Sequence, residues 1–202
     1  MPLIPQAMQG LVQAKAASQL IAGSKLPSFV SGICNATCQY VISSSVVNST
    51  NVAVGPGSGT QIGRIVGLVP NLMSTLMVAK AASSGLAGRD ISKLCGSVAF
   101  GVCNAMQTVV MQGTIVGAGP GTGTGKILGL VPNVLSGLIL AQMAGQTLSG
   151  SKLSSLASAI AFGICTHLLT TAIVTITDIG VASPPPAGPV PVPAAPGIGR
   201  FV

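Results

Sequence analysis

The chain repeats itself three times, and this repeat constrains its fold more than any other feature of the sequence. Residues 67–71, Gly-Leu-Val-Pro-Asn, recur 62 residues later at 129–133. Residues 14–18, Ala-Lys-Ala-Ala-Ser, recur 65 residues later at 79–83. Many further matches follow the same two offsets, which chance does not produce. The sequence therefore consists of three related units, at residues 5–66, 67–128 and 129–182.

Each unit predicts the same succession of elements. It begins with a proline, at Pro5, Pro70 or Pro132, where a helix tolerates the missing N–H. Apolar residues at helical spacing follow, up to an Ala-Gly or Ser-Gly pair that ends the helix. A second helix is predicted near residues 26–41, 90–112 and 152–170. β-branched residues then predict short strands at 46–54, 109–116 and 173–181, and glycine–threonine loops at 55–63 and 117–125 connect to the next unit.

The predicted fold class is mainly α with short β segments, in the form of three tandem helical-hairpin repeats plus an extended Pro-rich C-terminal arm. One hairpin of this size cannot bury its apolar face alone, so the three units must share a core. The sequence leaves open whether they stack in a row or surround a pseudo-threefold axis. Residues 1–182 are expected to form a single domain.

Charge is scarce in this chain. Charged residues make up 5% of it, against about 25% in ordinary soluble domains. Much of the surface is thus neutral, which favours a protein covered by partners or by lipid. The net charge is +7, but the nine cations are scattered singly and the chain has no Trp and one Tyr. Nucleic-acid binders cluster cations beside aromatic residues, so no nucleic-acid partner is expected.

The residues that carry catalysis are nearly absent. Asp90 and Asp178 are the only acidic residues, and nothing in the sequence pairs them in one cleft. Residues 119–126 look like a phosphate-binding loop, but Pro120 and Ile127 stand where that motif needs Gly and Ser or Thr. We expect no enzyme activity, no cofactor and no catalytic residues.

Five cysteines offer metal or disulfide chemistry. Only one closely spaced pair exists, Cys34 with Cys38, and His167 stands alone, so no metal site is expected. The repeat-equivalent Cys38, Cys103 and Cys165 favour a packing role. The odd number leaves at least one thiol free or paired between chains, and the candidates for an interchain disulfide are Cys34, Cys38 and Cys95.

A membrane protein is the main alternative. Residues 94–125, 127–151 and 153–177 carry no formal charge and are each long enough to span a bilayer. Interfacial aromatic residues are almost lacking, however, and glycines and prolines divide these stretches. The first five residues lack the basic region of a signal peptide, so none is expected. A small Gly/Ala-rich membrane protein with helical hairpins remains the alternative.

Residues 183–202 are rich in proline and lack a core of their own, so we expect them to lie extended across a neighbouring subunit. The expected docking residues are Pro184, Pro185, Pro186, Pro191, Pro193, Arg200 and Phe201. The alternative is that this arm folds back on the chain's own repeats.

The Gly-Leu-Val-Pro-Asn units, the Gly-Thr connectors and the Pro-rich arm together resemble structural proteins of tailed-bacteriophage virions, of the tail or baseplate type. The resemblance implies a scaffold, plug or adaptor that is located in the virion and is surrounded by other structural proteins, with self-association.

Overall fold

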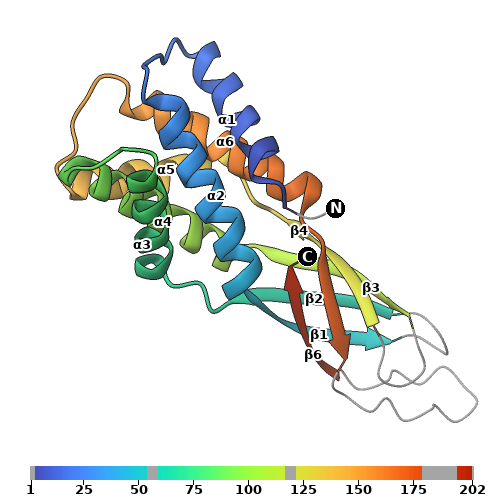
Figure 1. Cartoon of the computed structure of the whole chain (residues 1–202). Helices are drawn as coiled ribbons and strands as arrows, with labels where there is room; N and C mark the ends of the chain where they lie inside the picture. Colours follow the sequence, from blue (N-terminus) through green and yellow to red (C-terminus); the bar gives the residue numbers. More distant parts are fainter. Residues whose placement is uncertain (1–2, 54–58, 117–121, 179–194, 202) are drawn as a thin grey trace, which may run out of the picture.

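The computed structural model describes residues 3–53, 59–116, 122–178 and 195–201, in which helices and strands alternate in pairs (Figure 1). Two helices precede two strands, and this order occurs three times. The elements are α1 (Pro5–Ser18), α2 (Leu26–Ser44), β1 (Val46–Ala53), β2 (Gly59–Val66), α3 (Pro70–Ser83), α4 (Arg89–Thr108), β3 (Val110–Val116), β4 (Thr122–Leu128), α5 (Pro132–Gly145), α6 (Leu153–Thr171), β5 (Val174–Asp178) and β6 (Ala195–Phe201).

The six strands close into an antiparallel barrel in the order β1-β2-β3-β4-β5-β6, with β6 paired to β1. The predicted fold class, mainly α with short β segments in three tandem helical hairpins, is therefore wrong. The expected Gly-Thr connectors at 55–63 and 117–125 supply more than half of both β2 and β4. Residues 195–201 of the expected arm form β6, which pairs with both β1 and β5. Together the β segments build one end of the molecule (Figure 1).

The six helices form a ring at one end of the barrel (Figure 1). Each helix packs against the helices before and after it in the chain, and α6 packs against α1 to close the ring. A pseudo-threefold axis therefore relates the three helix–helix–strand–strand units. Three seams between units result, at α2–α3, α4–α5 and α6–α1.

Small residues four positions apart allow the helices to approach closely at these seams. The pairs are Gly32 with Ala36, Ser97 with Gly101, and Ala159 with Gly163, and each pair belongs to the second helix of its unit. A Cβ atom at Gly101 would lie 2.6 Å from the Ile139 side chain across the α4–α5 seam. Glycine is required there because a real Cβ would collide with its neighbour.

The barrel interior is narrow and filled. Inward positions on β1, β3 and β5 carry bulky residues, among them Val47, Met111 and Val174, all fully buried. The repeat-equivalent inward positions on β2, β4 and β6 are Gly63, Gly125 and Gly199. A Cβ at Gly63 would lie 2.8 Å from Val47, and one at Gly199 would lie 2.9 Å from Val174. Glycine on alternate strands thus makes room for the large side chains of their neighbours.

One continuous core links the barrel to the ring of helices. Ile65, Ile127 and Phe201 are the last buried residues of β2, β4 and β6, and they join the helix residues in a single cluster. Among the described helices, α6 alone is long and apolar enough to cross a membrane, and half of its apolar stretch is buried inside the fold. Core helices of soluble proteins pass the same test, so this feature is weak evidence for a membrane span.

Candidate functional site

The Gly-Leu-Val-Pro motif turns the chain from a strand into a helix. Gly67 adopts a φ of 83° and Gly129 a φ of 85°, the left-handed conformation that favours glycine. The next residue is buried, and the one after it is the N-cap of the helix. Pro70 and Pro132 then occupy the first helical position. At the start of α1, Leu3 is likewise buried, Ile4 is the N-cap and Pro5 is the first helical residue.

Each of these turns leaves a large apolar side chain exposed at the junction of barrel and helices. The N-cap residues Ile4, Val69 and Val131 are 39%, 45% and 47% exposed. Leu72 and Val134, one helical turn later, are 59% and 56% exposed. We call these five residues the junction belt. Single exposed apolar residues are common on protein surfaces, but here they recur at repeat-equivalent positions around the molecule.

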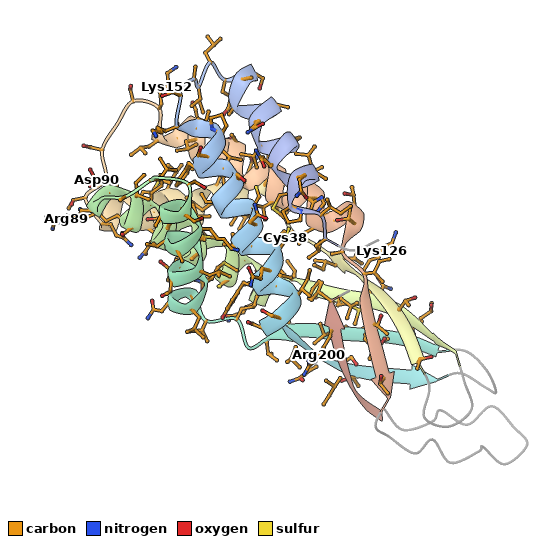
Figure 2. All side chains as sticks on the ribbon, in the orientation of Figure 1. Cys38, Arg89, Asp90, Lys126, Lys152 and Arg200 are labelled. Atoms are coloured by element: carbon orange, nitrogen blue, oxygen red, sulfur yellow. The ribbon has the colours of Figure 1, made fainter. Side chains whose placement is uncertain are left out.

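Three cations accompany the belt on the outer wall of the barrel. Arg64 lies on β2, Lys126 on β4 and Arg200 on β6. Each cation immediately precedes the last buried residue of its strand. All three side chains are exposed. Lys126 and Arg200 are labelled in Figure 2, close to the end of the barrel that meets the helices.

Threonines line the outer wall further from the helices. Thr60, Thr114, Thr124 and Thr175 are cross-strand partners in a row over β2, β3, β4 and β5. An open hollow of about 500 Å³ lies over this wall and also includes Lys126. Hydroxyl groups there can donate and accept hydrogen bonds. Among the described residues that line the hollow, Lys126 is the one ionisable group.

All five cysteines are free and buried in the chain's own core. The expectation of an interchain disulfide through Cys34, Cys38 or Cys95 is therefore wrong for this fold, because none of these thiols reaches the surface. Burial raises the pKa of Cys38 to about 12 and that of Cys95 to about 11. The thiols are thus held in the protonated, unreactive form at neutral pH.

His167 lies at the seam that closes the ring. Its Nε2 atom accepts a hydrogen bond of 3.2 Å from the backbone N–H of Ile4. Burial lowers the pKa of His167, which favours the neutral ring that this bond requires. At the equivalent place in the α2–α3 seam, the hydroxyl of Tyr40 accepts a bond of 3.0 Å from the N–H of Val69. His167 therefore has a structural role in this fold.

The expected docking arm divides into two parts. Pro184, Pro185, Pro186, Pro191 and Pro193 lie outside the described residues. Arg200 is exposed on β6, whereas Phe201 is 2% exposed and packs in the chain's own core. The expectation that Phe201 anchors in a partner's pocket is therefore wrong. For residues 195–201 the chain folds back on its own repeats, because β6 is needed to close the barrel.

Lys126 does not stand at the start of a helix, as a phosphate-binding loop would require, but in the middle of β4 opposite Gln112. Within the described ranges, no three His, Cys, Asp or Glu side chains come together as metal ligands would. No acidic side chain described by the structure lies near Lys126, so the wall has no evident acid–base pair.

Sequence reasoning missed the belt and the set of three cations, although a signal for the latter is present. Residues 62–66 read Ile-Gly-Arg-Ile-Val, and residues 198–202 read Ile-Gly-Arg-Phe-Val. This match places the last residues of the chain in the third unit, in register with β2. Residues 124–128, Thr-Gly-Lys-Ile-Leu, are the second copy.

Neither the protein-family models, nor the curated proteins, nor the solved structures contain a match to this chain.

Proposed function

We propose that this chain is a non-enzymatic structural subunit of a large protein assembly, in which it serves as an adaptor or plug. The observation that supports this most is the junction belt, because it exposes large apolar side chains three times in register on a surface that carries little charge. Exposed apolar surface rimmed by polar residues is typical of sites that other proteins cover, and the repeat-equivalent positions of the belt make chance exposure a poor explanation. The resemblance of the sequence to tail and baseplate proteins makes a phage virion the proposed setting.

The closed architecture supports a plug or spacer. Strands of a closed barrel have no free edges, so a partner cannot add a strand to the sheet and must contact side chains instead. The barrel interior is occupied by side chains such as Val47, Met111 and Ile65, each at most 1% exposed. Side chains therefore fill the barrel interior at these described positions, as expected for a plug.

The test is whether the chain is found in particles and whether the belt holds it there. Particles purified on a density gradient from producing cells should contain the chain at a fixed ratio to other components. The double variant Leu72→Ser/Val134→Ser should move to the free fraction. Exposed positions change the free energy of unfolding by about 0.5 kcal/mol or less each, so its circular dichroism and thermal midpoint should stay close to those of the unchanged chain.

A matched control is available at the other end of the helices. Leu20 is 82% exposed and lies between α1 and α2, away from the barrel. It has a φ of 54°, which asparagine tolerates. Leu20→Asn should stay in the particle. Recovery of the unchanged chain only as a free monomer, in cells that make particles, would overturn the proposal.

A further inference from the structure

The cations Arg64, Lys126 and Arg200 occupy one position in the three units. They stand on β2, β4 and β6, which alternate with the other strands around the closed barrel. Strand pairing supports the equivalence, because the glycine before each cation lies opposite a large buried residue. These pairs are Gly63 with Met111, Gly125 with Val174, and Gly199 with Val47. Strands lie about 4.8 Å apart and rise about 3.4 Å per residue. Lys126 is two strands away from Arg64 and staggered by two residues, so these cations start about 12 Å apart.

This is the one position at which all three units carry a cation. Lys15 and Lys80 correspond to Gln142 in the third unit. Lys25 and Lys152 correspond to Asp90 in the second. Arg89 and Lys93 correspond to serines in both other units. The three copies therefore share a cation only here, whereas every other charged position differs between the units.

The three cations lack an acidic partner among the described side chains. The one carboxylate described is that of Asp90, at the start of α4, and Figure 2 shows it at the end of the molecule away from Lys126 and Arg200. The belt residues Ile4, Val69 and Val131 lie just beyond the strand ends and follow the same threefold arrangement. Each unit thus presents an exposed cation together with an exposed apolar residue.

We infer that the partner at this junction is a homotrimer, or a ring whose copy number is a multiple of three, in which each copy places a carboxylate against one cation and an apolar side chain against one belt residue. This inference rests on the proposed function as a structural subunit. A monomeric partner would use one third of the repeated surface. A threefold partner engages all of it at once, and the second and third contacts then form at high effective concentration, so three weak sites give a stable attachment.

Photo-crosslinking in intact particles tests the symmetry of the partner. Ile4, Val69 and Val131 are each replaced, in separate variants, by p-benzoylphenylalanine. After irradiation, the crosslinked peptides are identified by mass spectrometry. We expect the same segment of the same partner polypeptide from all three positions. Different partner proteins at the three positions, or no crosslink from any of them, would overturn the inference while leaving the chain an established component of the particle.

Charge removal tests the role of the cations. Arg64→Gln, Lys126→Gln and Arg200→Gln should each speed release of the chain from purified particles by a similar factor, about two- to fivefold, as expected for exposed ion pairs. The triple variant should lose attachment by about the product of the three factors. Lys25→Gln and Lys152→Gln, at the far end of the helices, should release as slowly as the unchanged chain.

Other results of the same experiments count against the inference. An effect confined to one of the three cations would indicate a one-sided partner. Release of the chain by nuclease, or crosslinks to nucleic acid, would indicate a polynucleotide instead of acidic protein. Absence of the unchanged chain from particles would overturn the proposed function itself, and this outcome is separate from the others.

Discussion

Gly163 offers the sharpest test of the closed ring. It lies on α6, and a Cβ atom there would lie 2.8 Å from the backbone nitrogen of Val12 on α1 and would also overlap the Val12 side chain. A backbone atom cannot rotate away. Gly163→Ala must therefore push α1 and α6 apart at the seam that closes the ring, while it also gives α6 a better helix-forming residue.

The two effects can be separated with a control. Replacing glycine by alanine inside a helix gains about 1 kcal/mol, and Gly137→Ala on α5 should show this gain because a Cβ there meets nothing within 4 Å. Overpacking a well-packed core costs about 1–3 kcal/mol. Gly163→Ala should therefore be less stable than Gly137→Ala by about 1–3 kcal/mol, which is a difference of about 2–12 °C in Tm for a chain of this size.

Urea unfolding followed by circular dichroism at 222 nm measures both variants against the unchanged chain. The m-value should stay constant, so that the shift in midpoint reports stability alone. Equal stabilisation by Gly163→Ala and Gly137→Ala would refute the close approach of α1 and α6, and with it the closed ring. Ala36 at the equivalent position of the α2–α3 seam shows that a methyl group is tolerated where the seam is built around it.

Three further predictions concern the interior. In Gly113→Ala, the new Cβ would lie 2.7 Å from the Gly125 backbone on the paired strand, so urea unfolding should show a loss of about 2 kcal/mol or more; a neutral effect would contradict the narrow barrel. The lowered pKa of His167 means that the unfolded chain takes up the proton first, so stability should fall as pH drops below about 6.5, by at most about 1.4 kcal/mol per pH unit. His167→Ala, which places there the residue found at Ala105 in the second unit, should flatten this dependence in unfolding curves measured from pH 7 to 5. The five buried thiols should react with Ellman's reagent only after unfolding in urea, and fast labelling of the native chain would contradict their burial.

The helices could be predicted because their signals are local. Proline at the first helical position and apolar residues at helical spacing place α1, α3 and α5 at the expected prolines. The second helices also agree within a few residues at most of their ends, although α4 ends at Thr108, before the expected residue 112. β-branched residues likewise identified β1, β3 and β5.

The even-numbered strands could not be recognised by the same rules. Glycine is generally depleted in strands, so the glycine-rich β2, β4 and β6 read as loops or as part of an arm. In a barrel this narrow, glycine at inward positions is what allows Met111 and Val174 to fit opposite. That requirement arises only after the strands close on one another, so it leaves no local signal in the sequence.

The junction belt was hidden for a different reason. Val69 and Val131 are apolar, and sequence periodicity assigns apolar residues to the core, yet the turn at the preceding glycine and the buried leucine leave them at the surface. The three cations could have been predicted from the sequence, because residues 198–202 match residues 62–66 at four of five positions. The different spacing of the third unit, which has 16 residues between β5 and β6, concealed this match.

A single chain with three units can vary its seams while the cations on the barrel wall stay alike. At the same position in each seam, the second helix carries Tyr40, Ala105 or His167. Tyr40 and His167 accept a hydrogen bond from the backbone N–H of the next N-cap residue, whereas the alanine side chain has no acceptor. The α6–α1 seam, which no backbone connection spans, also has Lys15 5.3 Å from the Phe162 ring. Closing a ring without a covalent link costs chain entropy, so added side-chain contacts at this seam offset that cost. A trimer of three identical units would have the same side-chain contacts at all three seams. Because the three units belong to one chain, their seams can differ, while the cations on the barrel wall remain threefold, as the inferred threefold partner would require.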